Sequence, residues 1–427
     1  MCPLCDLSVP LAGILLLFAA AISSVDPMTS HRAKPAWAVP VASSRAGRHR
    51  AMQCIVIVVT GLLLLTSASL RAADPSPPVW QGVWRGMVGT VPVRACLAWD
   101  RVGPGDAFGA YYYLSKLRTI HLTQQGTSRV WVEGDAGPKD PPGPRWTFAE
   151  VGRDRLAGTW SNGRHTLPFR LARVGGGGAD GDDDGPCGTA AFNGLRWRPL
   201  TVAAASAAMD GVRYRVLTFD PGPAFPTVAM AGFALIGDDA ATRRINLGLR
   251  AQVPGSKDEW HDCVTGGLEA NGEDGYLQQT LAPTLITSRW LGAALTQEDG
   301  CGGAHPNNST MPVTFDRTTG AAVGLHTWLN DAALDRSEAG ANLPPTVHPA
   351  FRRLIVANAG DVDADCRDAL VDEEFWDIGL DRRGLTFRPE LPHAVAVCAD
   401  DELVPWATLD RFLTPAGRAG RVSLTRR

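Results

Sequence analysis

The stretch CGGAHPNN, residues 301–308, brings a thiol, an imidazole and two amides close together in the chain. A thiol beside an imidazole can act as a nucleophile and its base, with Cys301 attacking and His305 taking the proton. This chemistry requires a reduced thiolate, because a disulfide-bonded sulfur is not a nucleophile of this kind. Catalysis here therefore depends on the redox state of Cys301.

A zinc site is a second interpretation of the same stretch. His261 and Cys263 have an H-x-C spacing, and Cys301 and His305 a C-x3-H spacing, which strands and turns could bring around one tetrahedral ion. In an oxidising compartment, disulfide formation competes with zinc for such thiolates. Zinc binding is therefore a weaker alternative if the protein is exported.

A turn is the third interpretation, and the one we favour. Gly302 and Gly303 allow a positive φ angle or a close backbone approach, and Pro306 restricts the chain after His305. The imidazole of His305 would then hydrogen-bond to nearby backbone, and Cys301 would be disulfide-bonded. This interpretation predicts no metal site and no cofactor.

The remainder of the sequence offers weak signals for catalysis. It contains no HExxH, GxSxG, SxxK or phosphate-loop motif. Paired carboxylates can cleave glycosides, but a run of acidic residues is more often a solvated face. Such a run occurs at Asp361, Asp363, Asp365, Asp368, Asp372, Glu373 and Glu374. The aspartates of GGGGADGDDDGPCG, residues 175–188, lack the spacing of a calcium-binding EF-hand loop and are typical of a flexible tether.

Composition is that of a globular protein. Hydrophobic residues make up 45% of the 427 residues and charged residues 20%, which excludes a disordered chain. The net charge of −3 gives no reason to expect general attraction to nucleic acid or to anionic lipid.

A leader precedes the globular part. A basic segment containing Arg45, Arg48 and Arg50 is followed by an apolar core, residues 55–65, and small residues at Ala72 and Ala73, as in a secretory signal. We expect a signal peptide over about residues 45–73, translation beginning at Met28 or Met52, and no mature residues before 74. An uncleaved two-helix membrane anchor is the alternative.

If the protein is exported, its cysteines are expected to form disulfides, because the compartments outside the cytoplasm are oxidising. Beyond residue 74 there are six cysteines, an even number that suggests three disulfides. Six cysteines allow fifteen connectivities, so the pairing stays open. Their order along the chain favours three neighbouring pairs, one per structural block: Cys96–Cys187, Cys263–Cys301 and Cys366–Cys398.

Residues 79–174 are expected to form a small antiparallel β-barrel or half-barrel. Short segments rich in β-branched and aromatic residues, such as GAYYYL and RVWVE, alternate with Gly, Asp, Pro or Asn, and no helical period appears. Closure would satisfy the strand edges. Several tryptophans fall here; an exposed one could stack on a sugar ring or anchor a protein, although each is more often core. We take Trp80 and Trp84 as candidate binding residues.

The second folded block, residues 194–416, mixes strands and helices and follows a Gly/Asp-rich linker, residues 175–193. RYRVLTFDP and TVAMAGFALIG are expected to be strands, DAATRRINLGLRAQV a helix, and TLITSRWLGAALTQED one long strand. MPVTFDRTTGAAVGL predicts a hairpin turning at DRTTG. One or two helices are expected over residues 347–376, then two strands in GLTFRPELPHAVAVC and a short final helix. His326 is placed in a strand, and the basic tail, residues 417–427, is expected to fray.

This second block resembles an extracytoplasmic domain of unknown function, over roughly residues 205–415. The resemblance rests on LITSRWLGAAL before the GGAH tetrapeptide, on the hairpin around Asp316 with Thr319 and Gly320, and on GLTFRPELPHAVAVCADDELVPWATLDRFL. Such domains occur at the C-terminus of lysozyme-sensing anti-sigma factors and beside the catalytic domain of certain peptidoglycan deacetylases. The resemblance implies an α+β domain with helices on an antiparallel sheet. It carries over neither activity, because neither a deacetylase domain nor a sigma-binding segment accompanies it.

Together these observations predict an exported, periplasmic, disulfide-stabilised envelope protein without enzymatic activity. It would bind an unknown protein partner or a cell-wall glycan, but not nucleic acid, and would contact a membrane only through an uncleaved leader. His305 and Asn307 join Trp80 and Trp84 as candidate binding residues. The alternative is a cell-wall hydrolase using His305 and nearby carboxylates, which would require His305, Asp316 and a further polar side chain to meet in a pocket.

Overall fold

The computed structural model describes residues 77–99, 107–134, 143–174, 185–256, 259–337, 339–340, 344–360 and 362–425. The predicted leader, residues 1–73, lies outside the described residues, as do residues 175–184 of the linker and Asp361. Within the described ranges, no helix combines the length and the apolar composition needed to cross a bilayer.

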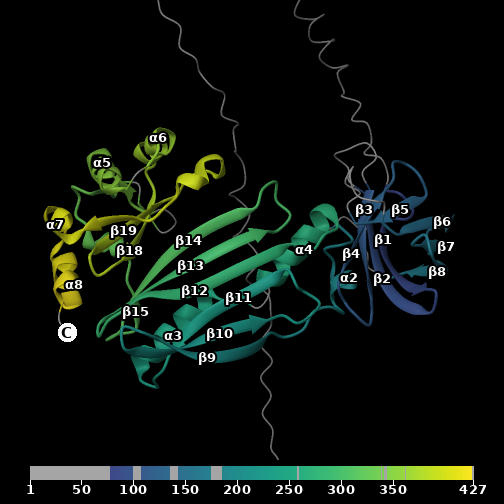
Figure 1. The fold of residues 1–427 in the computed structure, drawn as a ribbon, viewed down its shortest axis with the longest axis horizontal. Coiled ribbons are helices and arrows are strands. Elements are labelled where there is room, and N and C mark those ends of the chain that lie inside the picture. Colours follow the sequence, from purple (N-terminus) through teal and green to yellow (C-terminus); the bar gives the residue numbers. More distant parts are fainter. Residues whose placement is uncertain are drawn as a thin grey trace, which may run out of the picture. The chain divides into compact units, whose positions relative to one another are not determined.

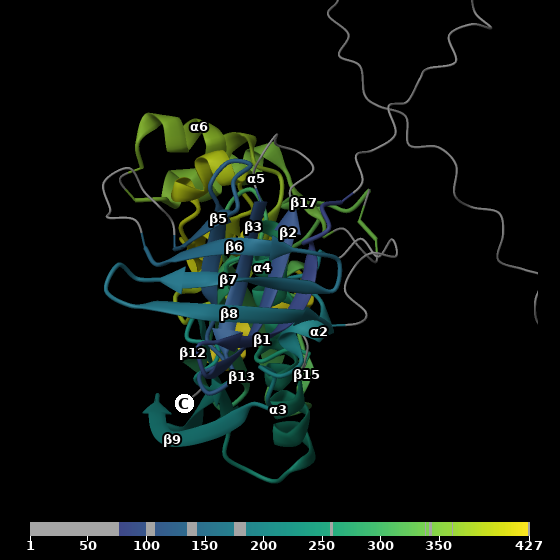
Figure 2. The same ribbon diagram turned by 90° about the vertical axis from the view of Figure 1, so that its right-hand side faces the viewer.

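The N-terminal part is a closed antiparallel barrel in which each strand pairs with the next and β8 pairs with β1 (Figures 1 and 2). This confirms the predicted barrel. Its strands are β1 Gly82–Val88, β2 Val91–Trp99, β3 Ala107–Tyr113, β4 Ile120–Gln124, β5 Val130–Glu133, β6 Arg145–Val151, β7 Arg155–Ser161 and β8 Thr166–Arg173.

Aromatic side chains fill the barrel. Trp84, Tyr111 and Trp146 are fully buried in one cluster, since alternate residues of each strand point inward. The carboxylate of Glu133 accepts hydrogen bonds from the hydroxyl of Tyr111 (2.6 Å) and from the indole N–H groups of Trp146 (3.1 Å) and Trp160 (2.5 Å). Burial, and then the negative charge of Glu133, raise the pKa of Tyr111 above its usual value, so the hydroxyl remains a donor.

The described part of the linker is packed rather than solvated. Helix α2, Ala190–Asn193, follows Cys187, and both Cys187 and Phe192 are fully buried. The hydroxyl of Tyr112 in β3 donates to the carbonyl of Phe192 (2.6 Å). From residue 185 onward, the expectation of a flexible tether is therefore wrong, because Cys187 and Phe192 complete a hydrophobic cluster on the outer side of the barrel.

A seven-stranded sheet forms the centre of the remaining chain, in the order β15-β14-β13-β12-β11-β10-β9 (Figure 1). All neighbours are antiparallel except β11 and β12, which are parallel. Two helices, α3 Ala240–Gln252 and α4 Glu259–Asn271, connect that pair and pack on the sheet. The strands are β9 Thr201–Met209, β10 Val212–Asp220, β11 Val228–Leu235, β12 Tyr276–Ile286, β13 Trp290–Gly300, β14 Asn307–Asp316 and β15 Ala321–Ala322.

The C-terminal elements surround a second core, which includes Trp290 and Trp328. They comprise two small sheets, β16-β17 and β18-β19-β20, with helices around them. Their bounds are η1 Leu325–Trp328, β16 Leu334–Asp335, β17 Thr346–Val347, α5 Pro349–Asn358, α6 Ala364–Asp372, β18 Trp376–Leu380, β19 Gly384–Pro389, η2 His393–Cys398, β20 Glu402–Pro405, α7 Trp406–Leu409, η3 Asp410–Phe412 and α8 Pro415–Thr425. The fold is α+β, as predicted.

Several expected elements differ from the structure. The single strand expected over TLITSRWLGAALTQED is two strands, because Thr287 accepts from the backbone N–H of Trp290 and closes a turn between β12 and β13. His326 lies in the 3-10 helix η1 rather than in a strand, and HAVAVC, also expected as a strand, forms η2. The tail expected to fray is helical, because α8 packs on Trp328 through Gly417 and Gly420.

The described residues contain three disulfides: Cys96–Cys187, Cys263–Cys301 and Cys366–Cys398. These are the three neighbouring pairs favoured by the order of the cysteines. Bonds of this kind persist in oxidising compartments. The disulfides therefore agree with an extracytoplasmic location.

A buried arginine joins the barrel to the sheet. The side chain of Arg196 is 0% exposed, and its guanidinium lies 2.6 Å from the carboxylate of Asp274, which also accepts from the hydroxyl of Thr119 (2.7 Å). The same guanidinium donates to the carbonyls of Leu117 (3.0 Å) and Ala224 (3.2 Å). Residues from the β3–β4 loop, the chain after α2 and the loop after α4 thus share one polar network. No sequence motif pointed to it.

Candidate functional site

The CGGAHPNN stretch forms the loop between β13 and β14. Cys301 directly follows β13, and Asn307 begins β14. Gly302 has a φ of +93°, and a Cβ atom there would collide with the carbonyl of Gly266 in α4. The loop can therefore pass this close to the helix only with glycine at this position.

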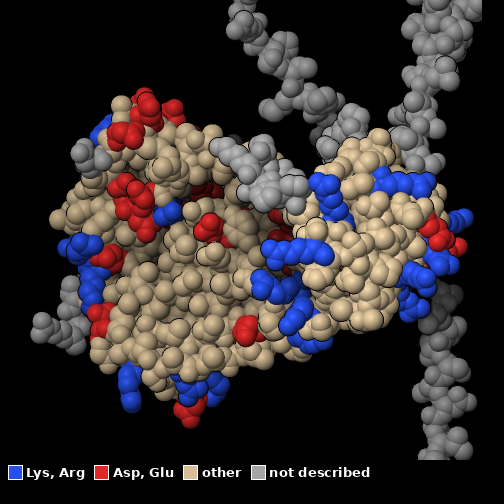
Figure 3. All heavy atoms as spheres, turned by 45° about the vertical axis from the view of Figure 1, so that its right-hand side comes forward, with Lys and Arg blue, Asp and Glu red and all other residues tan. Residues whose placement is uncertain are grey.

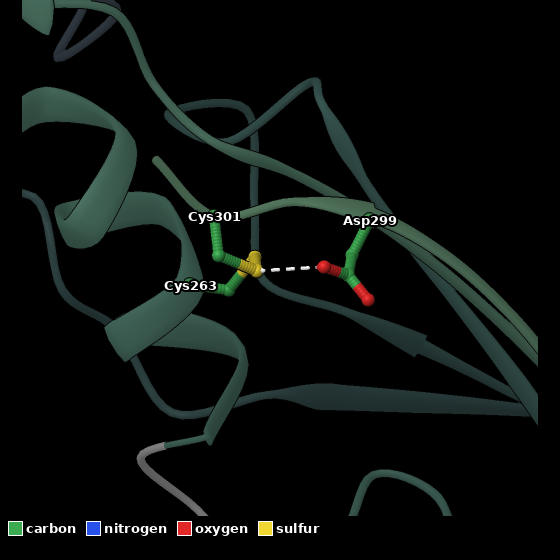
Figure 4. A group of neighbouring side chains, drawn as sticks. All are labelled: Cys263, Asp299 and Cys301. Carbon is green, nitrogen blue, oxygen red and sulfur yellow. Dashed lines mark hydrogen bonds between the residues drawn. A yellow bond between two sulfur atoms is a disulfide. The ribbon is translucent and has the colours of Figure 1, made fainter. Parts of the chain in front are cut away.

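The disulfide Cys263–Cys301 attaches this loop to α4, beside the buried carboxylate of Asp299 (Figure 4). Asp299 is 4% exposed; it accepts hydrogen bonds from the side-chain amides of Gln297 (2.7 Å) and Asn307 (3.1 Å). Its Oδ1 atom also lies 3.2 Å from the Sγ atom of Cys301. A disulfide sulfur carries no hydrogen, so this last separation is a contact and not a hydrogen bond.

The disulfide is incompatible with Cys301 acting as a nucleophile and with Cys263 and Cys301 binding zinc. The ligand atoms of Cys263, Asp299 and Cys301 lie within 4.8 Å of one another, as metal ligands would. Both sulfurs, however, are bonded to each other, so neither is a thiolate able to attack a substrate or coordinate zinc. In the oxidised protein the stretch is a turn held by a disulfide, with Asn307 bound to Asp299.

Among the described residues, the ring of His305 makes no hydrogen bond to backbone of the kind that the turn interpretation expected. Its ring stacks on that of His393 from η2, with centroids 4.9 Å apart and planes 11° apart. Both histidines are exposed, and His261 lies elsewhere, against Trp260 and Phe225. The two histidines proposed as zinc ligands are therefore not brought together.

The arrangement required for a hydrolase is not met. His305 precedes β14 and Asp316 ends it, so the length of the strand, about 30 Å, separates them. Asp316 is bound to Arg289 (3.3 Å) and Thr318. Burial raises the pKa of Asp316, but the hydrogen bonds from Thr318 and the charge of Arg289 outweigh burial and hold that pKa below its usual value.

The acidic run begins at Asp361, which lies outside the described residues, and continues into helix α6. Asp363 caps the N-terminus of α6 by accepting from the backbone N–H of Cys366, and Asp365 and Asp368 lie within the helix. A pocket among the described residues includes Asp335, His348 and Glu374 in its lining, but none of the predicted binding residues. The structure thus groups no described carboxylate with His305.

A carboxyl group that the sequence did not single out has a strongly raised pKa. Burial raises the pKa of Asp377 in β18 from 3.8 to about 6; the charge of Glu390 also raises it, whereas that of Arg388 lowers it. The folded state therefore binds the proton more tightly than the unfolded state between about pH 4 and pH 6. Stability contributed by this group is present at low pH and is lost as pH rises through that window.

Replacing Asp377 with asparagine is expected to raise the midpoint of thermal unfolding by roughly 2–4 °C at pH 7 and to leave it nearly unchanged at pH 4. Circular dichroism at the two pH values measures the effect. The control is Asp331→Asn, which removes an exposed partner of Arg336. Equal shifts of the Asp377 variant at both pH values would contradict the argument.

Of the two candidate aromatic residues, Trp84 is fully buried and Trp80 is partly exposed. Trp84 is 0% exposed, with the guanidinium of Arg173 over its ring at 4.3 Å, so its assignment as a binding residue is wrong. Trp80 is half-buried and packs edge-on against Trp131 (5.2 Å). The tryptophans of the barrel mainly form its core because inward positions of a small barrel must be filled.

A strand that the sequence analysis did not identify forms one edge of the large sheet. Strand β9 pairs with β10 along its whole length, from Thr201 opposite Asp220 to Met209 opposite Val212. No strand of the described residues pairs with its other side. Seven of its nine residues are exposed, and the strand contains no charged residue and no proline. Figure 1 shows β9 along the lower border of the sheet.

Comparisons with known proteins concern the fold. No known family profile matches the chain, and no curated protein does. A DUF3298 family structure from Bacteroides fragilis is 12% identical and covers 53% of this chain and 96% of its own, with a TM-score of 0.34. Another, from Pseudomonas aeruginosa, is 16% identical and covers 52% of this chain and 97% of its own, with a TM-score of 0.30. Both belong to a family named as a domain of unknown function; the anti-sigma-factor and deacetylase contexts stay predictions.

Proposed function

We propose that this protein is an exported, non-enzymatic component of the cell envelope, located in the periplasm, that binds a protein partner through β9. The observation that carries the proposal is the open edge of this strand. An unpaired strand edge offers a row of backbone donors and acceptors to an extended segment of another chain. The three disulfides support the extracytoplasmic setting.

The hairpin geometry identifies the backbone groups that would bind. Asp210 and Gly211, both with positive φ, form a two-residue turn between β9 and β10. Such a turn is closed by a hydrogen-bonded pair, here Met209 with Val212, so odd-numbered residues of β9 bond to β10. The N–H and C=O groups of the even-numbered residues then point to the free edge; these residues are Val202, Ala204, Ser206 and Ala208.

The side chains suit a peptide better than a sugar. Most residues of β9 are alanine, which leaves the backbone accessible but offers neither the aromatic face nor the polar groups that bind glycans. The opposite edge of the sheet is protected, since β14 carries Pro312 and is partly paired by β15. We therefore prefer a protein partner to a cell-wall glycan, and no arrangement of His305 supports the hydrolase.

Site-specific photocrosslinking in cells tests the proposal. A crosslinking residue at Ala204 is expected to yield a discrete adduct with another envelope protein, whereas one at Leu247 of α3, which is 70% exposed, is not. Replacing Ser206 with proline removes one outward donor while the bonds to β10 remain, and should lower the adduct yield about tenfold or more.

The matched control is Ser206→Val, which changes the same side chain and keeps the backbone donor. An adduct lost in the proline variant and kept in the valine variant supports strand pairing. Failure to form an adduct at Ala204, or an adduct that survives Ser206→Pro, refutes it. An adduct with a second copy of this chain would replace the proposed partner with self-association.

A further inference from the structure

Two regions of the chain have opposite net charges. Residues 79–174 contain 13 lysines and arginines against 7 aspartates and glutamates, whereas residues 175–427 contain 22 against 34. Figure 3 shows basic side chains around the barrel and most acidic ones over the C-terminal elements. The barrel is thus a cationic module in a chain of nearly neutral net charge.

Three arginines lie next to one another on the outer wall of the barrel. Arg170 in β8 is opposite Met87 in β1, and Ala172 is opposite both Arg85 in β1 and Arg155 in β7. Arg170 is therefore a diagonal neighbour of both other arginines, at about 7–8 Å. All three are exposed and alternate with inward-facing core residues. Strands β7 and β8 face the viewer in Figure 2.

This arginine triad, Arg85, Arg155 and Arg170, is poorly neutralised. Arg155 lies 3.6 Å from the exposed carboxylate of Glu150, a surface pair of little energetic value. Within the described part of the chain, neither Arg85 nor Arg170 has a carboxylate within 4.0 Å. Like charges at neighbouring positions of a sheet repel one another. An anion that binds all three would relieve this repulsion, and guanidinium groups match phosphate oxygens in geometry.

Apolar side chains beside the triad indicate what kind of anion binds. Met87 is 40% exposed and pairs directly with Arg170 on the outer wall. Leu167 (37% exposed) and Val91 (38%) follow the register of the inward-facing residues and lie at the rim of the barrel, beside the β1–β2 turn. The side chain of Leu167 lies against Gly89 in that turn. A soluble polyanion would make no use of exposed aliphatic groups. A lipid surface would, because its phosphates lie just above a hydrocarbon layer.

We propose that the arginine triad and the neighbouring aliphatic residues bind the phosphate-bearing surface of an anionic lipid bilayer. The arginines contact the headgroups, and Met87, Leu167 and Val91 reach between them. This site is independent of β9 and does not require the leader. It adds to the protein a peripheral membrane contact that the net charge of −3 would not suggest.

Co-sedimentation with vesicles tests the proposal on the full chain. Vesicles of phosphatidylcholine alone measure any binding by the leader. Vesicles in which roughly one lipid in three is the anionic phosphatidylglycerol add a negative surface charge. Binding is expected to be stronger to the anionic vesicles and to weaken at high salt. Arg85→Ser with Arg170→Ser should weaken the anionic binding about 30-fold, since each arginine near such a surface contributes about a factor of five.

The control double variant is Arg250→Ser with Arg353→Ser, which removes two exposed arginines outside the barrel. Met87→Gln with Leu167→Gln should weaken binding while preserving its salt dependence. Equal binding of the native chain to both kinds of vesicle, or of the triad and control variants to anionic vesicles, overturns the proposal. Binding to soluble polyphosphate or an acidic polysaccharide without binding to vesicles overturns it in favour of a soluble polyanion.

Discussion

Replacing Arg196 with leucine is expected to lower the free energy of unfolding by about 3–5 kcal/mol, the usual cost of leaving one member of a buried ion pair alone. The carboxylate of Asp274, whose side chain is 8% exposed, would lose its cationic partner and retain, among the described residues, the hydrogen bond from the hydroxyl of Thr119. The carbonyls of Leu117 and Ala224 would also lose their donor. Unfolding in urea, followed by tryptophan fluorescence under oxidising conditions, measures the loss.

Two further variants separate the ion pair from general effects of losing an arginine. Arg250→Leu removes an exposed arginine and is expected to change the free energy of unfolding by less than about 0.5 kcal/mol. The double variant Arg196→Leu with Asp274→Leu should be more stable than Arg196→Leu alone, because it leaves no buried charge. A loss below about 1 kcal/mol for the single variant would show that water reaches Asp274 and that the network does not connect the barrel to the sheet energetically.

Removing the disulfide Cys96–Cys187 by replacing both cysteines with alanine should have a comparable effect. The bond spans 91 residues, and closing a loop of that size in the unfolded chain corresponds to about 4.6 kcal/mol in the chain-entropy description. Both cysteines are 0% exposed, so the substitutions also leave unfilled volume in the cluster that contains Tyr112 and Phe192.

The comparison for this prediction is Cys366→Ala with Cys398→Ala, measured by the same urea unfolding. That bond spans 32 residues, and Cys366 is only partly buried, so the packing loss is smaller. The expected loss is about 3.7 kcal/mol from chain entropy alone. A smaller loss for Cys96–Cys187 than for Cys366–Cys398 would mean that α2 is held on the barrel by its apolar contacts and not by the covalent bond.

The barrel could be predicted because its signals are local. Each strand is short, rich in β-branched or aromatic residues and bounded by turn residues, so the local sequence indicates a series of short antiparallel strands. The local sequence did not show that tryptophan side chains fill the interior of the barrel. Whether Trp84 points inward depends on the pairing of β1 with β2 and β8, which is a property of the closed sheet.

Strand β9 and helix α4 were missed because their residues favour other structures. Five of the nine residues of β9 are alanine, which is disfavoured in strands, so pairing with β10 decides its conformation. Helix α4 contains Gly266 and Gly267, which weaken any helical signal. The structure explains both glycines, since a Cβ atom at either position would collide with the backbone of Cys301 or Gly275.

The candidate site was predicted in part. The order of the cysteines indicated the disulfide Cys263–Cys301, which reduces the CGGAHPNN stretch to a turn. The role of Asn307 beside Asp299 depends on the register of β13 and β14, which places these two residues opposite each other. The stacking of His305 on His393 joins segments almost ninety residues apart, and no local pattern could have shown it.

The order of the disulfides bears on how this chain matures. The six described cysteines pair in chain order, the first with the second, the third with the fourth and the fifth with the sixth, so no bond encloses or crosses another. A chain that leaves the cytoplasm N-terminus first presents these cysteines in the same order. If an oxidase takes up the two electrons and two protons each time a new thiol joins the unpaired thiol before it, the native connectivity forms directly. Slow thiol–disulfide reshuffling is unnecessary for this arrangement, and an oxidase without an isomerase is sufficient to complete it.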